Sequence, residues 1–262
     1  MSRTSAETVP VFPDLAGKTA VVTGGSKGIG EATCRVLSAN GVKVAVVARG
    51  REAVDKLVDE LRADGGEAIG LTSDCTRLDD MERLRREAES ELGPTDILVA
   101  FAGGFSRATP ILELDEEEWR FVVDSNLTAT FFALKAFLPG MIERRRGAIV
   151  TMSSNAGRYL DPPLSAAYAA AKGGIVVLTR HVAKEVGPHG VRVNCVAPAT
   201  TLTERVKGVM NEERRAAIAA MTPLGRLGVP EDSAYAALYL CSDAAAWITG
   251  VTIDIAGGRV ML

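Results

Sequence analysis

The chain has 262 residues, of which 47% are hydrophobic and 24% charged, with a formal net charge of −3. This length and composition suit one large α/β domain with a substantial core. The small negative charge offers no general attraction to nucleic acid or to an anionic membrane surface, so neither is expected as a partner. No apolar run approaches the roughly 18 residues of a membrane span, and we expect a cytoplasmic protein. Residues 1–14 are expected to form an N-terminal tail, either loose or lying as a strap on the surface.

The first predicted strand, 18–23, runs directly into a glycine-rich turn that precedes a helical segment. Glycines at this spacing permit a tight turn and let a phosphate approach the backbone at the N-terminus of the helix. Three glycines alone are a weak signal, but their position between a strand and a helix favours nucleotide binding. The residues expected to bind are Gly24, Ser26, Lys27, Gly28, Ile29 and Gly30.

The second predicted strand, 43–48, is followed by Arg49. NAD-binding sites of this kind usually carry a carboxylate here, which bonds the ribose 2′-hydroxyl. Arg49 suits a 2′-phosphate instead, together with Lys27 of the glycine-rich turn. The sequence therefore favours NADP(H) over NAD(H). The alternative is that Arg49 is only a solvated loop residue.

Strands and helices alternate along the rest of the chain. Further strands are predicted at 67–71, 95–101, 147–152, 191–196 and 251–255, and helices at 52–63, 78–92, 116–143, 204–220, from Ser165 and from Pro230. The pattern predicts a single α/β domain over 15–262, a doubly wound Rossmann fold whose seven-stranded parallel sheet is flanked by helices. Ligands of such sheets bind outside the carboxyl ends of the strands, where segment 200–222 is expected to form a substrate lid.

The segment from Ser165 to Lys172 is rich in alanine and predicts the start of a helix with Ser165 as its N-cap. Tyr168 and Lys172 would then lie on one helical face. A cation roughly 4 Å from the phenol, at an effective dielectric of about 20, would lower the tyrosine pKa by about three units. The phenol would become a usable proton donor near neutral pH. A tyrosine four residues before a lysine also arises by chance, so the pair depends on the rest of the site.

The four cysteines, Cys34, Cys75, Cys195 and Cys241, are scattered, and neither they nor the two histidines show a metal-ligand spacing. We expect reduced core cysteines and no metal site.

Together these features resemble the short-chain dehydrogenase/reductase family, and in particular its 3-oxoacyl-carrier-protein-reductase-like members. The resemblance extends from about residue 15 to residue 258. It rests on the glycine-rich turn, on the Tyr168-x-x-x-Lys172 pair, and on Asn126, Ser154 and Pro198 in the expected order.

The resemblance implies a role for each of these side chains. Tyr168 would be the acid or base of a carbonyl–alcohol interconversion, Lys172 would lower its pKa and hold the nicotinamide ribose, and Ser154 would polarise the substrate oxygen. Asn126 would hold a helix irregularity and a water on a proton path to Lys172. The alternatives are a strand-end cap for Ser154 and an internally bonded core amide for Asn126.

The resemblance also implies further contacts. Cofactor contacts are expected at Asp74, Cys75, Ala102, Gly103, Tyr168, Lys172, Pro198, Thr201 and Thr203, although Asp74 has the alternative of a helix-capping carboxylate. Substrate contacts are expected at Phe105, Asn155 and Tyr159.

The chain departs from the family pattern after the fourth strand, where the usual Asn-Asn is Ala100-Phe101, and after Pro198, where Ala199 replaces a glycine. The segment between Ser154 and Tyr168 is one residue longer than is common. These differences concern the cofactor pocket rather than the reaction class.

The implied function is an NADP(H)-dependent oxidoreductase for a small-molecule carbonyl or alcohol, assembled as a homotetramer or homodimer through apolar positions of helices 127–138 and 175–182. An NAD-dependent dehydrogenase and a non-catalytic cofactor-binding scaffold are the alternatives. The pocket residues do not select one substrate.

Overall fold

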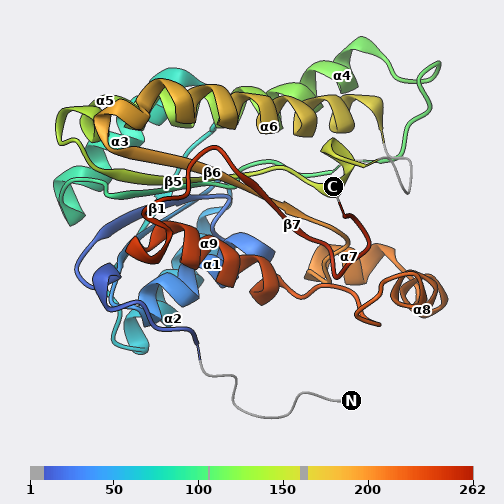
Figure 1. The fold of residues 1–262 in the computed structure, drawn as a ribbon, viewed down its shortest axis with the longest axis horizontal. Coiled ribbons are helices and arrows are strands. Elements are labelled where there is room, and N and C mark those ends of the chain that lie inside the picture. Colours follow the sequence, from blue (N-terminus) through green and yellow to red (C-terminus); the bar gives the residue numbers. More distant parts are fainter. Residues whose placement is uncertain (1–8, 106, 160–164, 262) are drawn as a thin grey trace.

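Seven parallel strands form one sheet through the centre of the molecule (Figure 1). The computed structural model describes residues 9–105, 107–159 and 165–261. Neighbouring strands follow the order β3-β2-β1-β4-β5-β6-β7. Their bounds are β1 Thr19–Thr23, β2 Lys43–Ala48, β3 Ala68–Thr72, β4 Ile97–Ala100, β5 Gly147–Met152, β6 Val191–Pro198 and β7 Thr252–Ile255. The predicted α/β fold and its seven-stranded parallel sheet are confirmed.

Helices cover both faces of the sheet, because each pair of consecutive parallel strands needs a crossover connection. In Figure 1 one layer consists of α3 (Leu78–Leu92), α5 (Ala129–Glu143) and α6 (Ala166–Val186). The opposite layer consists of α1 (Gly28–Ala39), α2 (Arg51–Ala63) and α9 (Pro230–Cys241). Successive strand residues point to opposite faces. Val21 therefore packs in the core under the first layer, and Val22 packs in the core under the second.

Two predicted helices are divided in the structure. The helix expected at 116–143 consists of α4 (Glu116–Val123), a π-helical turn η2 (Asp124–Thr128) and α5. The lid segment contains α7 (Glu204–Val209) and α8 (Glu212–Ala220). Ser165 occupies the N-cap position of α6, but its side chain makes no capping hydrogen bond.

The described part of the expected N-terminal tail packs against the domain. The backbone N–H of Phe12 donates to Oδ1 of Asn40 at 2.8 Å, and its ring lies 6.3 Å from that of Tyr239 in α9. Residues 1–8 of the tail lie outside the described residues.

The helical stretch 116–143 is long and apolar enough to cross a membrane, contrary to the expectation that no segment would be. Of its most apolar window, 44% is buried inside the structure. Phe137 and Met141 of α5 are buried in the core against the sheet. Since core helices pass the same test, the finding is weak evidence for a membrane span. The cytoplasmic location stays a prediction.

Candidate active site

The residues predicted to bind cofactor and substrate follow strands β1, β2, β4, β5 and β6 at their carboxyl ends. Because these strands are parallel and adjacent, the segments that follow them meet at one edge of the sheet. The structure therefore brings together segments that are up to about 180 residues apart in the sequence, from the turn after Thr23 to the lid that begins after Pro198.

The glycine-rich turn after β1 is closely packed. A Cβ at Gly30 would lie 2.1 Å from the carbonyl oxygen of Gly24, and Gly28 has a φ of +57°, which favours glycine. Helix α1 begins at Gly28 with Lys27 as an N-cap residue that makes no side-chain capping bond. Any side chain at Gly30 would therefore collide with the turn itself, so the turn can fold back on the start of α1 only with glycine there. The turn and the first backbone N–H groups of α1 form a cradle that fits the diphosphate of a dinucleotide.

The loop after β4 is braced without the two amides that the family pattern would place there. Oγ1 of Thr23 accepts a hydrogen bond from the N–H of Ala102 at 3.1 Å. Oδ1 of Asn126 accepts one from the N–H of Gly104 at 3.0 Å. Phe101 instead packs into the core and is 6% exposed. The Thr23 hydroxyl and the Asn126 amide therefore hold the backbone of the loop after β4 close to β1 and to the π-helical turn.

Asn126 lies in the π-helical turn and is fully buried. Its Nδ2 donates to the carbonyl oxygens of Val122 at 2.9 Å and Gly104 at 3.2 Å, and its own carbonyl accepts from Oγ1 of Thr130 at 2.8 Å. A Cβ at Gly103 would lie 2.5 Å from its Oδ1. The side chain is thus an internally bonded core amide that positions the loop. The water path to Lys172 stays a prediction.

Ser154 has the capping role that was its alternative, and its role in polarising the substrate oxygen stays a prediction. As the N-cap of a 3₁₀ turn over Asn155–Gly157, its Oγ accepts from the N–H of Ala156 at 3.2 Å. The same hydroxyl donates to Oδ1 of Asn155 at 3.1 Å and is hydrogen-bonded to the phenol of Tyr168. The cap fixes the hydroxyl beside the tyrosine.

Tyr168 and Lys172 lie one turn apart on α6, and both are buried. Nζ of Lys172 donates to the carbonyl oxygen of Met152 at 2.9 Å and lies 5.6 Å from the centre of the Tyr168 ring. The Oγ of Ser153 donates to the carbonyl of Lys172 at 2.8 Å and ties α6 to the end of β5. These bonds fix the lysine between the tyrosine and the strand.

Burial dominates the acid–base properties of this pair. It raises the pKa of Tyr168, while the hydrogen bond with Ser154 and the positive charge of Arg205 act in the opposite direction. Burial lowers the pKa of Lys172 to about 8, against a smaller raising effect of Cys195. The expected net lowering of the tyrosine pKa by Lys172 is therefore not found. The reason is that the loss of solvation outweighs the favourable charges.

The two cations expected to bind a 2′-phosphate are both exposed to solvent. They are Lys27, after β1, and Arg49, after β2. Asp74, after β3, accepts hydrogen bonds at Oδ1 from the N–H of Thr76 at 3.0 Å and from its hydroxyl at 2.7 Å. These bonds, with a smaller effect of Arg49, hold the pKa of Asp74 below its usual range. Burial raises the pKa of the adjacent Cys75 thiol to about 12. Arg49 and Asp74 therefore lie near each other, and the Cys75 thiol stays neutral.

The lid begins against the glycine-rich turn. The N–H of Ala199, directly after Pro198, donates to the carbonyl of Ile255 at 3.0 Å, and Oγ1 of Thr201 donates to the carbonyl of Ala199 at 3.1 Å. Thr203 caps α7, and its Cγ2 lies 2.9 Å from where a Cβ at Gly28 would stand. The structure thus brings Thr203 to the cofactor cradle.

The expected substrate residues gather around Tyr168. The ring of Phe105 meets that of Tyr168 edge to face, with centres 5.6 Å apart. Asn155 is buried beside Ser154, and its carbonyl accepts from the N–H of Tyr159 at 2.6 Å. Tyr159 itself is 47% exposed. The segment 160–164, which follows Tyr159, lies outside the described residues.

Sequence reasoning missed Arg205, the second residue of α7. Its Nη2 donates to the carbonyl oxygen of Phe105, and its charge reaches Tyr168. The only sequence signal is an arginine two residues after Thr203, within a segment already rich in arginine and glutamate.

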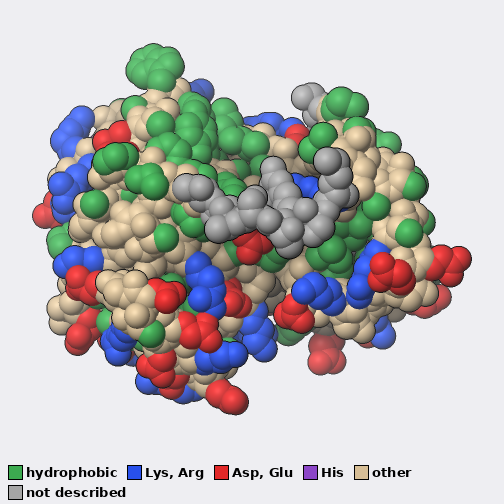
Figure 2. All heavy atoms as spheres, turned by 90° about the horizontal axis from the view of Figure 1, so that it is seen from below, with side chains coloured by type: hydrophobic (Ala, Val, Ile, Leu, Met, Phe, Trp, Pro, Cys, Tyr) green, Lys and Arg blue, Asp and Glu red, His purple; other side chains and the backbone are tan. Residues whose placement is uncertain are grey.

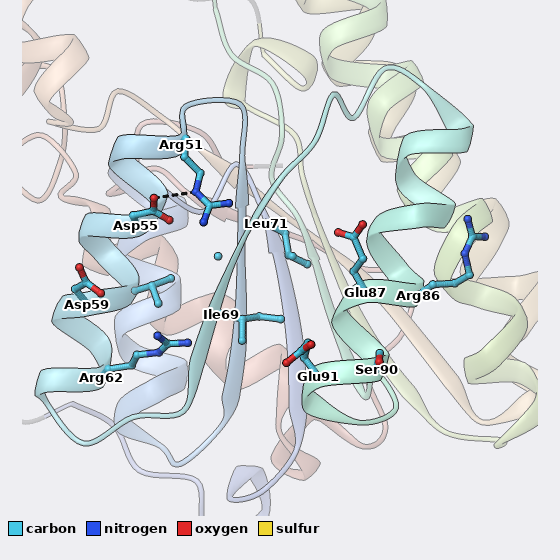
Figure 3. Close-up of a pocket in the computed structure, with 12 residues that line it drawn as sticks. Arg51, Asp55, Asp59, Arg62, Ile69, Leu71, Arg86, Glu87, Ser90 and Glu91 are labelled. Atoms are coloured by element: carbon cyan, nitrogen blue, oxygen red, sulfur yellow. Dashed lines mark hydrogen bonds and ion pairs between the residues drawn. The ribbon is translucent and has the colours of Figure 1, made fainter.

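A charged groove lies away from this site, and a smaller cavity adjoins it. A groove of about 860 Å³ follows the edge strand β3 between α2 and α3. Figure 3 shows its charged walls, with Arg51 paired to Asp55 on α2 and Glu87 and Glu91 on α3. A smaller cavity of about 260 Å³ lies beside the lid and is lined by Thr200 and Ile218, among others. Within the described ranges, no group of His, Cys, Asp and Glu side chains is placed to hold a metal ion.

Comparison with known proteins supplies relatives that cover nearly the whole chain. A family model described as Enoyl-(Acyl carrier protein) reductase matches residues 24–259. The 3-oxoacyl-[acyl-carrier-protein] reductase FabG of Vibrio cholerae is 38% identical over 249 residues, which cover 95% of this chain and 100% of that protein. The 3-oxoacyl-[acyl-carrier-protein] reductase of Synechocystis is 39% identical, over 94% of this chain and 98% of that protein.

Solved structures are similarly close. A 3-oxoacyl-[acyl-carrier protein] reductase from Brucella melitensis superimposes with a TM-score of 0.92 at 34% identity, over 100% of this chain and 98% of that one. A Brucella melitensis reductase with bound NAD gives a TM-score of 0.90 at 33% identity, over the same shares of the two chains.

Proposed function

The chain belongs to the short-chain dehydrogenase/reductase family and is an oxidoreductase of that type; from this premise we propose that it interconverts a carbonyl and an alcohol with NADP(H), using Tyr168 as the acid or base. One observation carries the proposal. The buried Tyr168 is hydrogen-bonded to Ser154 and lies one helical turn from Lys172.

The residues present suit a nicotinamide dinucleotide, because the glycine-rich turn lies at the N-terminus of α1, where backbone N–H groups can bind a phosphate. The turn and the neighbouring loop depend on glycine for their close packing, since a Cβ at Gly24 would collide with the carbonyl of Phe101 and one at Gly103 with Oδ1 of Asn126. When bound, the nicotinamide supplies or accepts the hydride. The cofactor would be held by Gly24, Ser26, Lys27, Gly28, Ile29, Gly30, Arg49, Asp74, Cys75, Ala102, Gly103, Tyr168, Lys172, Pro198, Thr201 and Thr203.

The side chains of the protein bind the substrate oxygen and transfer its proton. Ser154 donates a hydrogen bond to the carbonyl oxygen, where negative charge develops during reduction. Tyr168 donates its proton to the same oxygen and takes it back in the reverse direction. Lys172, whose Nζ donates to the carbonyl oxygen of Met152, lies beside the ring of Tyr168 and would bind the ribose hydroxyls of the cofactor.

The names of the relatives make a 3-oxoacyl thioester the first substrate to test. We expect the purified chain to oxidise NADPH in the presence of acetoacetyl-coenzyme A. The reaction is measured as the loss of absorbance of the reduced cofactor. Phe105, Asn155 and Tyr159 would contact the acyl group. Tight NADPH binding without turnover on a broad panel of ketones and thioesters would favour the non-catalytic scaffold instead.

The cofactor preference rests on Arg49. We expect Arg49→Gln to raise the KM for NADPH about tenfold, because a charge-assisted bond to the 2′-phosphate is lost, and to leave the KM for NADH nearly unchanged. Arg51→Gln is the matched control, since Arg51 is already paired with Asp55 at 2.8 Å. Steady-state kinetics with both cofactors measure the effect. Equal use of NADH and NADPH by the native chain would support the NAD-dependent alternative.

We further propose a homotetramer or homodimer. Phe131 of α5 and Val177 of α6 are 43% and 64% exposed, and Trp247, before β7, is fully exposed. The opposite helical layer mixes charged side chains of both signs with an apolar area (Figure 2). Contiguous exposed apolar patches mark contact surfaces, and we propose that Phe131 and Val177, on the helices α5 and α6 of one layer, belong to such a patch. Light scattering should give a multiple of 27.6 kDa, and a mass equal to one chain would contradict the assembly.

A further inference from the structure

Arg205 places a positive charge at the entrance to the active site. It lies on α7 of the lid and reaches across to the loop after β4, where its Nη2 donates to the carbonyl oxygen of Phe105. A Cβ at Gly104 would lie 2.9 Å from its Nη1, so the guanidinium rests directly on this backbone.

The same guanidinium is close to the reacting groups. Phe105 contacts Arg205 through its carbonyl oxygen and Tyr168 through its ring, whose centre is 5.6 Å from that of the tyrosine. The charge of Arg205 is near enough to lower the pKa of Tyr168 in opposition to burial. A substrate whose carbonyl reaches Tyr168 therefore passes within range of Arg205.

The charge of Arg205 is not neutralised by the described part of the chain, where the salt bridges of the neighbouring segments join Arg107 to Glu118 and Lys207 to Glu204. A guanidinium has five N–H donors in a planar fork, and the bond to Phe105 uses one of them. The remaining donors match a carboxylate or a phosphate, which bind arginine in a bidentate manner.

We propose that Arg205 is a specificity-determining residue that makes the site prefer carbonyl substrates bearing a carboxylate or phosphate group near the reacting carbon. The inference rests on the proposed oxidoreductase function and adds the substrate class. The anion replaces water on the exposed edge of the guanidinium while the carbonyl oxygen reaches Ser154 and Tyr168.

Two acid–ester pairs of aldehydes, in which each acid differs from its ester in charge and by one methyl group, test the inference. 3-Carboxybenzaldehyde and 4-carboxybenzaldehyde are ionised at neutral pH, and their methyl esters are neutral. We expect the native chain to show a higher kcat/KM for at least one acid than for its ester. Arg205→Gln should lower that acid-to-ester ratio about tenfold or more, because a hydrogen bond to a charged group is lost. Arg205→Lys should retain part of the preference.

Arg107→Gln is the matched control, since it removes one positive charge from the loop that follows Phe105, but from an arginine already paired with Glu118 at 2.8 Å. An unchanged ratio in Arg205→Gln, with turnover of the esters retained, would overturn the inference and leave the proposed function intact. A raised KM for the cofactor with an unchanged ratio would assign Arg205 to the cofactor and also overturn it. Absence of turnover by the native chain with every aldehyde and thioester would instead overturn the proposed function, and the inference with it.

Discussion

Tyr168→Phe is expected to lower kcat by about 10²–10⁴-fold, the usual contribution of a general acid or base. The phenol is hydrogen-bonded to Ser154, and burial keeps it protonated by raising its pKa. Removing the hydroxyl leaves the substrate oxygen with only the Ser154 hydrogen bond as negative charge develops. The measurement is single-turnover and steady-state oxidation of NADPH with the best thioester or aldehyde.

The variant should still fold and bind cofactor. The phenylalanine ring can keep the edge-to-face contact with Phe105, and only the hydrogen bond to Ser154 is lost. Tyr239→Phe is the control, because Tyr239 packs against Phe12 on the opposite helical layer and should leave kcat unchanged. Turnover by Tyr168→Phe equal to that of the native chain would remove Tyr168 from the proposed reaction.

The fold could be predicted because its signals are local. Runs of buried valine such as those in β1 and β2 are β-branched and short, and each is followed by a helical pattern of the right length. Ligands of such sheets bind outside the carboxyl ends of the strands. This rule places Ser154, Pro198 and the glycine-rich turn at one edge of the sheet before any contact between them is known.

The parts that sequence reasoning did not predict depend on tertiary contacts. The resemblance implies a helix irregularity at Asn126, which the structure contains, but not its form, a π-helical turn whose amide bonds both to Val122 within the helix and to Gly104 in a distant loop. Arg205 is positioned by a hydrogen bond to Phe105, a residue 100 positions earlier in the sequence. The tyrosine pKa was predicted from one charge, whereas burial of the phenol decides its direction.

Lys172→Met is expected to lower activity and yet stabilise the fold at neutral pH. Burial lowers the pKa of Lys172 from 10.5 to about 8. Between these values the unfolded chain binds more protons than the folded chain, so the free energy of unfolding rises with pH in this window. Below pH 8 the lysine is charged in both states, and the full penalty of burying the charge, about 3 kcal/mol from the difference of about 2.5 in pKa, is present.

A methionine at this position removes that penalty and fills a similar volume. The gain is reduced by about 1 kcal/mol, because the bond from Nζ to the carbonyl of Met152 is lost. Urea unfolding at pH 7 should therefore show Lys172→Met more stable than the native chain by roughly 1–3 kcal/mol, with the difference shrinking as the pH rises from 8 toward 10.5. The variant should retain at most about 1% of kcat, since the phenol and the ribose lose their lysine.

Lys184→Met separates this effect from a general benefit of removing a charge. Lys184 lies on the same helix, near its C-terminal end, and is exposed, so its substitution should change stability little at any pH. If Lys172→Met were less stable than the native chain at pH 7, the lysine would stabilise the fold on balance. That result would contradict the cost of burying its charge that the lowered pKa implies. If the variant is more stable but inactive, the fold keeps a buried ammonium at a cost to its stability because the reaction requires the lysine.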